Sequence, residues 1–166
     1  MYHAILLAVA LQHWERYSAH AVATRDVAGL LAKGAANPLH VLSVYEYERL
    51  PTTGLSAEMD ARYRDDQHRQ ADVLMERRMD DFIAPLKAAG IEVKTFLQVG
   101  KPREVIVKVA SGVMADLLII GSHSKRGIVD LALGGTARRL THEAPCTVLM
   151  VSPKAQAVSQ GATQAD

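Results

Sequence analysis

The sequence contains little that would indicate a disulfide-bonded, nucleic-acid-binding or membrane-spanning protein. Cys146 is the single cysteine among 166 residues, which excludes an internal disulfide and a metal site built from several cysteines. Aromatic residues make up only 5% of the chain and the formal net charge is +1, which argues against a base-stacking or electrostatic nucleic-acid-binding surface. The first apolar stretch, 4–11, is too short to span a membrane and follows no basic segment. We therefore expect a cytoplasmic protein with no nucleic-acid partner and no membrane insertion.

What the chain does contain is a regular alternation of apolar runs with segments of helical spacing. Alternation of buried strands with helices predicts a parallel sheet with helices on both of its faces. The predicted fold class is therefore α/β, an open five-stranded parallel sheet of Rossmann-like type. The expected strands are 5–10, 39–45, 92–99, 117–121 and 147–152, and the expected helices are about 16–33, 57–89, a short one from Pro102, and 135–143.

One domain over residues 1–152 accounts for all of these elements. From Pro153 onward no core pattern is present, and we expect residues 153–166 to form a disordered tail. The long polar helix contains Pro85 inside its apolar stripe, which should bend or interrupt it. Its charged residues are interpreted as a solvated face with pairs at a spacing of four. In the first helix the expected apolar positions are Ala19, Ala23, Val27, Leu30 and Leu31.

The most informative stretch begins where the fourth apolar run ends. Gly121, Ser122, His123 and Ser124 follow that run, and Gly134, Gly135 and Thr136 open the next helix. Two turns of small residues can bring backbone N–H groups close to an anion, usually phosphate. In parallel sheets ligands bind at the carboxyl ends of strands where the strand order reverses, which favours the turns after strands one and four. The alternative is that these glycines only make tight turns and close helix–sheet contacts.

At this point the chain resembles the universal stress protein family over roughly residues 2–152. The resemblance rests on the order of elements, on the segment 100–102, on the run 115–123, on Leu133–Gly134 and on the closing segment 144–151. It implies the universal stress protein, or adenine nucleotide alpha hydrolase-like, form of the fold. It also implies a homodimer, paired through the apolar edge strand Thr147, Val148, Leu149, Met150 and Val151.

Nucleotide-binding members of this family carry a pattern of glycines that this chain matches in part. Gly121 and Gly134 occupy the first and third glycine positions, Ser124 replaces the middle one, and Gly135 stands at the Ser/Thr position, one place before Thr136. The resemblance further implies nucleoside contacts at Ala8, Ala10 and Val44. An acid is usual at the position of Ala10, and its loss deletes a charge-assisted hydrogen bond of about 1.5–3 kcal/mol. The phosphate half of the site is thus mostly present and the nucleoside half weakened.

These observations lead to two functional hypotheses. The first is a regulatory stress-response module that binds ATP or a related adenine nucleotide weakly through Gly121–Thr136, with Mg²⁺ accompanying the phosphates and an unidentified protein as partner. The second is a dimeric stress or interaction protein that binds no nucleotide, which the changes at Ala10 and Ser124 favour. Enzymatic activity is at most weak ATP hydrolysis, because Ala10 replaces the best candidate for a water-positioning carboxylate.

A few further residues admit a functional and a purely structural interpretation. Trp14 could stack on a base or pack over the first helix, and His123 could contact a phosphate or face solvent. Lys125 and Arg126 could clamp phosphates but are more simply solvated. Cys146, at a strand start, is better explained as a small core residue than as a nucleophile.

Overall fold

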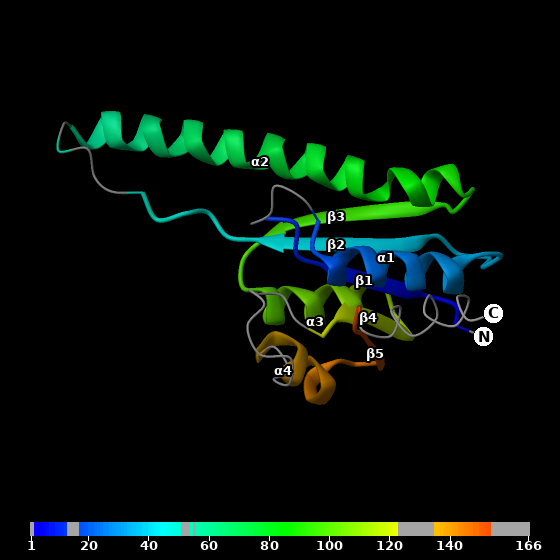
Figure 1. Cartoon of the computed structure of the whole chain (residues 1–166). Coiled ribbons are helices and arrows are strands. Elements are labelled where there is room, and N and C mark those ends of the chain that lie inside the picture. The colour runs from blue at the N-terminus through cyan, green and yellow to red at the C-terminus, as the bar shows by residue number, and fades with distance from the viewer. Residues whose placement is uncertain (1, 13–16, 51–53, 55, 123–134, 154–166) are drawn as a thin grey trace, which may run out of the picture.

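The computed structural model describes residues 2–12, 17–50, 54, 56–122 and 135–153 and confirms the predicted fold class (Figure 1). Five parallel strands form one sheet in the order β3-β2-β1-β4-β5. The strand order reverses at β1, because the chain first builds outward through β2 and β3 and then crosses to β4 on the other side. The elements are β1 (Ile5–Val9), α1 (Ala19–Ala32), β2 (Leu39–Tyr45), α2 (Ala57–Ala88), β3 (Val93–Val99), α3 (Pro102–Gly112), β4 (Leu117–Gly121), α4 (Gly135–Glu143) and β5 (Thr147–Val151).

The sheet separates two hydrophobic cores, each covered by a pair of helices. Side chains of β1 alternate between them: Ile5 and Leu7 pack under α1 and α2, whereas Leu6 and Ala8 pack against α3 and α4. All four side chains are at most 8% exposed. A strand buried on both faces must be apolar at every position, which explains the continuous runs in the sequence.

Helix α1 presents small residues to the sheet, in contrast to the predicted stripe. Its buried positions include Ala21, Thr24 and Ala28, whereas Leu30 is 73% exposed and Leu31 is 42% exposed. The close approach of α2 explains the difference, since a Cβ placed on Gly29 would lie 2.9 Å from Cδ2 of Leu86. Of the expected apolar positions, Ala23 is fully buried, while the leucines face outward. The helix also begins at Ala19, about three residues later than expected.

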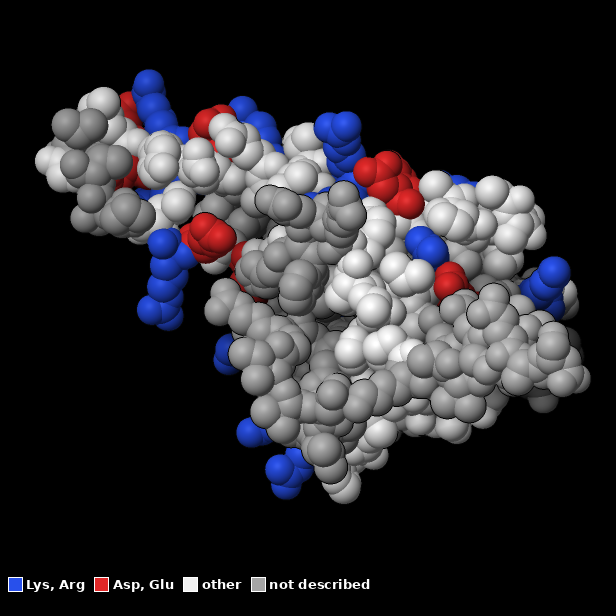
Figure 2. Space-filling model, viewed as in Figure 1, with Lys and Arg blue, Asp and Glu red and all other residues white. Residues whose placement is uncertain are grey.

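Helix α2 runs continuously through Pro85, so the expected interruption is wrong. Pro85 lies in the last turn, where the missing N–H removes a single helical hydrogen bond, and its carbonyl still accepts from Ala89 N–H at 3.1 Å. The buried residues of α2 begin only at Met75, and the helix before it extends past the end of the sheet (Figure 1). Acidic and basic side chains are interspersed along this exposed part (Figure 2), including an Arg62–Glu58 pair at 2.8 Å.

Strand β5 lies at an edge of the sheet, as predicted. Val151 is buried there, whereas Met150 is 39% exposed. In the described part of the chain, no helix has both the length and the apolar composition needed to cross a bilayer. The tail predicted for 153–166 lies outside the described residues, apart from Pro153 itself.

Candidate functional site

A cavity of about 280 Å³ lies at the carboxyl ends of β1, β2 and β4, where the strand order reverses. This is the position at which open parallel sheets bind their ligands. Three helices also reach it: α1, α3 and α4 all follow strands whose carboxyl ends point to this edge. The described lining residues are Ala8, Val9, Ala10, Gln12, Ser18, His20, Ala21, Thr24, Leu42, Val44, Tyr45, Glu46, Pro102, Ile106, Ile120, Gly121, Thr136, Ala137 and Leu140.

The first turns of three helices line the cavity, and no lysine or arginine is among its described lining residues. Ser18 caps α1, with its hydroxyl accepting from Ala21 N–H at 3.1 Å, Pro102 begins α3, and Thr136 lies in the first turn of α4. Unpaired N–H groups at helix N-termini carry partial positive charge and bind anions. The walls are otherwise mostly apolar, which suits a ligand with an apolar part and an anionic part.

The cavity brings together five of the residues singled out in the sequence. Ala8 and Val44 are each 8% exposed, and Ala10 is exposed just beyond β1. Gly121 is the last residue of β4, and Thr136 faces it from α4 across the same cavity. These residues are up to 128 positions apart in the chain and meet because parallel strands place their carboxyl ends at one edge.

The remaining predicted site residues are placed elsewhere or are not described. Ser122 is buried at 9% exposure, does not line the cavity, and its N–H donates to the Val151 carbonyl at 3.0 Å. Gly135 is exposed at the start of α4 and also does not line the cavity. His123, Ser124 and Gly134 lie outside the described residues, as do His13, Trp14, Lys125 and Arg126.

A side-chain amide fixes the rim of the cavity between β1 and β2. The Gln12 Oε1 accepts from the Glu46 backbone N–H at 3.0 Å, and the Gln12 Nε2 donates to the Glu46 carbonyl. The backbone at Gln12 is fixed by α2. The Arg78 guanidinium donates to the Leu11 carbonyl at 2.6 Å and to the Gln12 carbonyl at 2.8 Å. Glu46, which follows β2 directly, is therefore held at the rim by its backbone.

Tyr45 connects the cavity to α2. Its hydroxyl donates to Asp72 Oδ1 at 2.7 Å, and the Tyr47 hydroxyl donates to the same oxygen at 2.8 Å. Burial and the neighbouring Asp72 carboxylate raise the pKa of Tyr45 well above its ordinary value. Tyr45 therefore acts as a neutral donor at neutral pH, and its hydroxyl is already engaged by Asp72.

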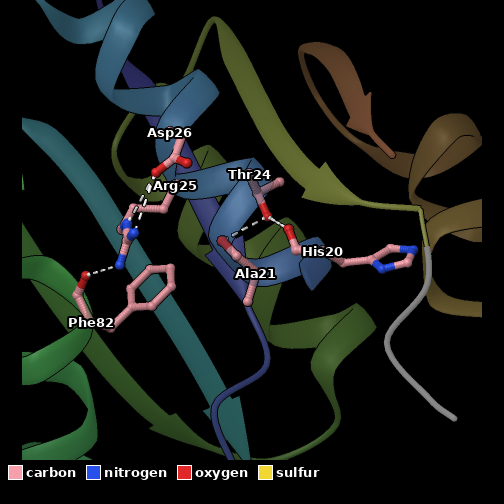
Figure 3. Close-up of polar contacts among 6 residues, drawn as sticks. All are labelled: His20, Ala21, Thr24, Arg25, Asp26 and Phe82. Carbon is pink, nitrogen blue, oxygen red and sulfur yellow. Dashed lines mark hydrogen bonds and ion pairs between the residues drawn. The ribbon is translucent and has the colours of Figure 1, made fainter. Parts of the chain in front are cut away.

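His20 and Thr24 line the cavity from α1 (Figure 3). The Thr24 hydroxyl donates to the His20 carbonyl and, at 3.2 Å, to the Ala21 carbonyl. The hydroxyl proton of Thr24 is therefore engaged within the helix. The His20 side chain instead extends away from α1 (Figure 3) and borders the same cavity as Gly121 and Thr136. The sequence analysis did not single out His20; its place in the first turn of α1, two residues after the N-cap Ser18, is the signal that could have identified it.

Cys146 has the surroundings of a packing residue. It is partly buried against the core on the α3–α4 side, and burial raises the pKa of its thiol. In the described residues no group of three or more His, Cys, Asp or Glu could hold a metal ion.

The fold and the cavity place this chain in the class of Rossmann-like α/β domains that have a ligand-sized cavity at the switch point. The model of the universal stress protein family matches residues 1–152, and the chain belongs to that family. Among curated relatives, a universal stress protein of Methanocaldococcus jannaschii is 32% identical over 77 residues, which are 46% of this chain and 48% of that protein. The chain thus matches about half the length of this curated relative.

Solved structures support the fold over nearly the whole chain. The structure of the M. jannaschii protein MJ0577 superposes with a TM-score of 0.72 at 22% identity, covering 91% of this chain and 96% of that one. A universal stress protein of Archaeoglobus fulgidus in complex with dAMP has a TM-score of 0.58 at 21% identity, covering 91% and 98%. Another universal stress protein, in complex with cAMP, has a TM-score of 0.58 at 19% identity, covering 92% and 98%.

Proposed function

We propose that this chain is a cytoplasmic regulatory module of the stress response that binds ATP or a related adenine nucleotide weakly in the switch-point cavity. The observation that carries the proposal is the cavity itself, in which Ala8, Ala10, Val44, Gly121 and Thr136 meet. The phosphates lie at Gly121 and the first turn of α4, and the nucleoside lies over the ends of β1 and β2. Two family members of the same fold hold adenine nucleotides, cAMP and dAMP.

The chemistry of the lining residues agrees with weak rather than tight binding. Helix N-termini offer hydrogen-bond donors to phosphate, but no described lining residue carries a permanent positive charge. Ala10 offers no carboxylate to the nucleoside. Mg²⁺ would arrive with the phosphates, since the described residues lack a metal-binding cluster of their own. Occupancy of the site would then alter a surface that a partner protein reads.

Mg-ATP is expected to raise the melting temperature of the purified protein. Binding at about 100 times the dissociation constant adds roughly 2.7 kcal/mol, and for a domain of this size that corresponds to a shift of about 5–10 °C. The measurement is a thermal denaturation scan with Mg-ATP, with AMP and with Mg²⁺ alone. A shift with ATP that exceeds the shift with AMP assigns binding energy to the phosphates. No shift with any nucleotide would refute the proposal.

The exposed edge strand supports a second candidate function, that of a dimeric interaction module. An unpaired apolar edge invites pairing with another chain, and Met150 of β5 is 39% exposed. We propose that β5 pairs with its counterpart in a second copy across a two-fold axis. Replacing Met150 with lysine is expected to convert the dimer to a monomer without changing the circular dichroism spectrum.

Light scattering after size-exclusion chromatography measures the mass of each form. Thr95→Lys, at an exposed position of the opposite edge strand β3, provides a comparison for added charge and should remain dimeric. A wild-type protein that elutes as a monomer at high concentration would contradict the dimer.

A further inference from the structure

Glu46 is the only carboxylate among the described residues that line the cavity. The other ionisable lining residues are His20 and Tyr45, and Tyr45 is engaged by Asp72. Glu46 is exposed, so its side chain is in contact with solvent at the rim of the cavity. The Glu46 carboxylate would repel an anionic ligand at close range, so its place beside a cavity lined by helix N-termini needs a physical reason.

The position of Glu46 in the sheet separates it from the phosphate end of the cavity. It follows β2, whereas Gly121 ends β4, and β1 lies between these two strands. Neighbouring strands are about 4.8 Å apart, so the ends of β2 and β4 are about 10 Å apart. A carboxylate repels phosphate at close range, and this spacing weakens that repulsion at the Gly121 side. The carboxylate thus borders the part of the cavity assigned to the nucleoside.

The backbone of Glu46 is held in place more firmly than that of an ordinary loop residue. Gln12 bonds both its N–H and its carbonyl, and Arg78 of α2 fixes the backbone of Gln12. Ala10 lines the same cavity just beyond the end of the neighbouring strand β1. Glu46 thus brings a carboxyl-bearing residue to the cavity after β2, next to the strand after which position 10 carries none.

We propose that the Glu46 carboxylate accepts hydrogen bonds from the sugar hydroxyl groups of the bound nucleotide. This inference rests on the proposed function and deepens it: the preferred ligand is a nucleotide with free 2′- and 3′-hydroxyl groups. Hydrogen bonds to a charged acceptor are stronger than neutral ones, and the carboxylate has two oxygens for two vicinal hydroxyls. Glu46 thereby sets specificity for the sugar and takes no part in phosphate binding.

The test compares the wild type and the Glu46→Gln variant, each with two ligands that differ only in the sugar. Mg-ATP and Mg-2′,3′-dideoxy-ATP share the base and the triphosphate and differ only in the sugar hydroxyl groups. In the wild type, ATP is expected to bind about ten-fold more tightly than the dideoxy form. In Glu46→Gln the two ligands are expected to bind with nearly equal affinity, because ATP loses most of its advantage. Removing a negative charge near a polyanion affects both ligands alike, so the ratio of the two affinities isolates the sugar contact.

Isothermal titration calorimetry measures the four affinities, with Glu48→Gln as the control. Glu48 is exposed two residues further along the same segment, does not line the cavity, and gives the same change in net charge. It is expected to keep the ten-fold preference for ATP. The proposal is overturned if Glu46→Gln retains that preference, or if the wild type binds both ligands equally well. Absence of any ATP binding by the wild type is a separate result, which refutes the proposed function and this inference together.

Discussion

Replacing Phe82 with alanine is expected to lower the free energy of unfolding by about 3–5 kcal/mol. Phe82 is fully buried in the core between α1, α2 and the sheet. The Tyr17 ring packs against it in a T-shaped arrangement with centroids 5.2 Å apart. The Arg25 guanidinium lies 5.5 Å from the centroid of the Phe82 ring, and Figure 3 shows these two side chains together. Alanine would remove the ring that both neighbours contact, and the rigid sheet behind them limits how far the space can collapse.

Urea denaturation followed by circular dichroism measures this loss, which corresponds to a melting temperature lower by roughly 10 °C or more. Val73→Ala is the matched control on the same helix, since Val73 is 60% exposed. It should change stability by no more than about 0.5 kcal/mol. Equal effects of the two substitutions would show that α2 does not pack on the sheet through Phe82.

The order of elements was predictable from the sequence because each strand is buried on both faces and is therefore apolar throughout. β1 and β4 show this most clearly. The orientation of α1 was not predictable, because its buried face is made of alanine, glycine and threonine. Apolar periodicity favours Leu30 and Leu31, but contact with α2 selects the residues that are small enough to fit. The expected effect of Pro85 was wrong because a proline in the last turn removes only one helical hydrogen bond, a loss that the end of a helix tolerates.

The candidate site was predictable in part. Gly121 and Thr136 could be placed from the turn after a buried strand and the start of the next helix, whereas Ala8, Ala10 and Val44 came from the family resemblance. Gln12, His20 and Glu46 were missed because each lies in a segment without a motif. Gln12 and Glu46 are joined by hydrogen bonds made only in the folded chain, and His20 reaches the cavity from the first turn of α1. The signal available for Glu46 was modest: a charged residue directly after a buried strand on the edge where the ligand was expected.

Replacing Ala8 with leucine is expected to weaken the binding of Mg-ATP at least about 100-fold, a loss of about 2.8 kcal/mol. Ala8 is 8% exposed and lines the cavity on the α3–α4 side of the sheet, together with Val44 and Ile120. The added carbon atoms would occupy part of a cavity of about 280 Å³, where the nucleoside is proposed to lie. Overpacking normally costs 1–3 kcal/mol, but here the new side chain enters existing space, so stability should change little.

Calorimetric titration with Mg-ATP measures the affinity, and a thermal scan without ligand establishes that the variant is folded. Ala84→Leu, on the exposed side of α2, adds the same atoms far from the cavity and should bind ATP as the wild type does. A folded Ala8→Leu protein that retains wild-type affinity would place the nucleotide outside the switch-point cavity. A selective loss would instead locate the nucleoside over the end of β1, between Glu46 and the turn at Gly121 where the phosphates are proposed to lie.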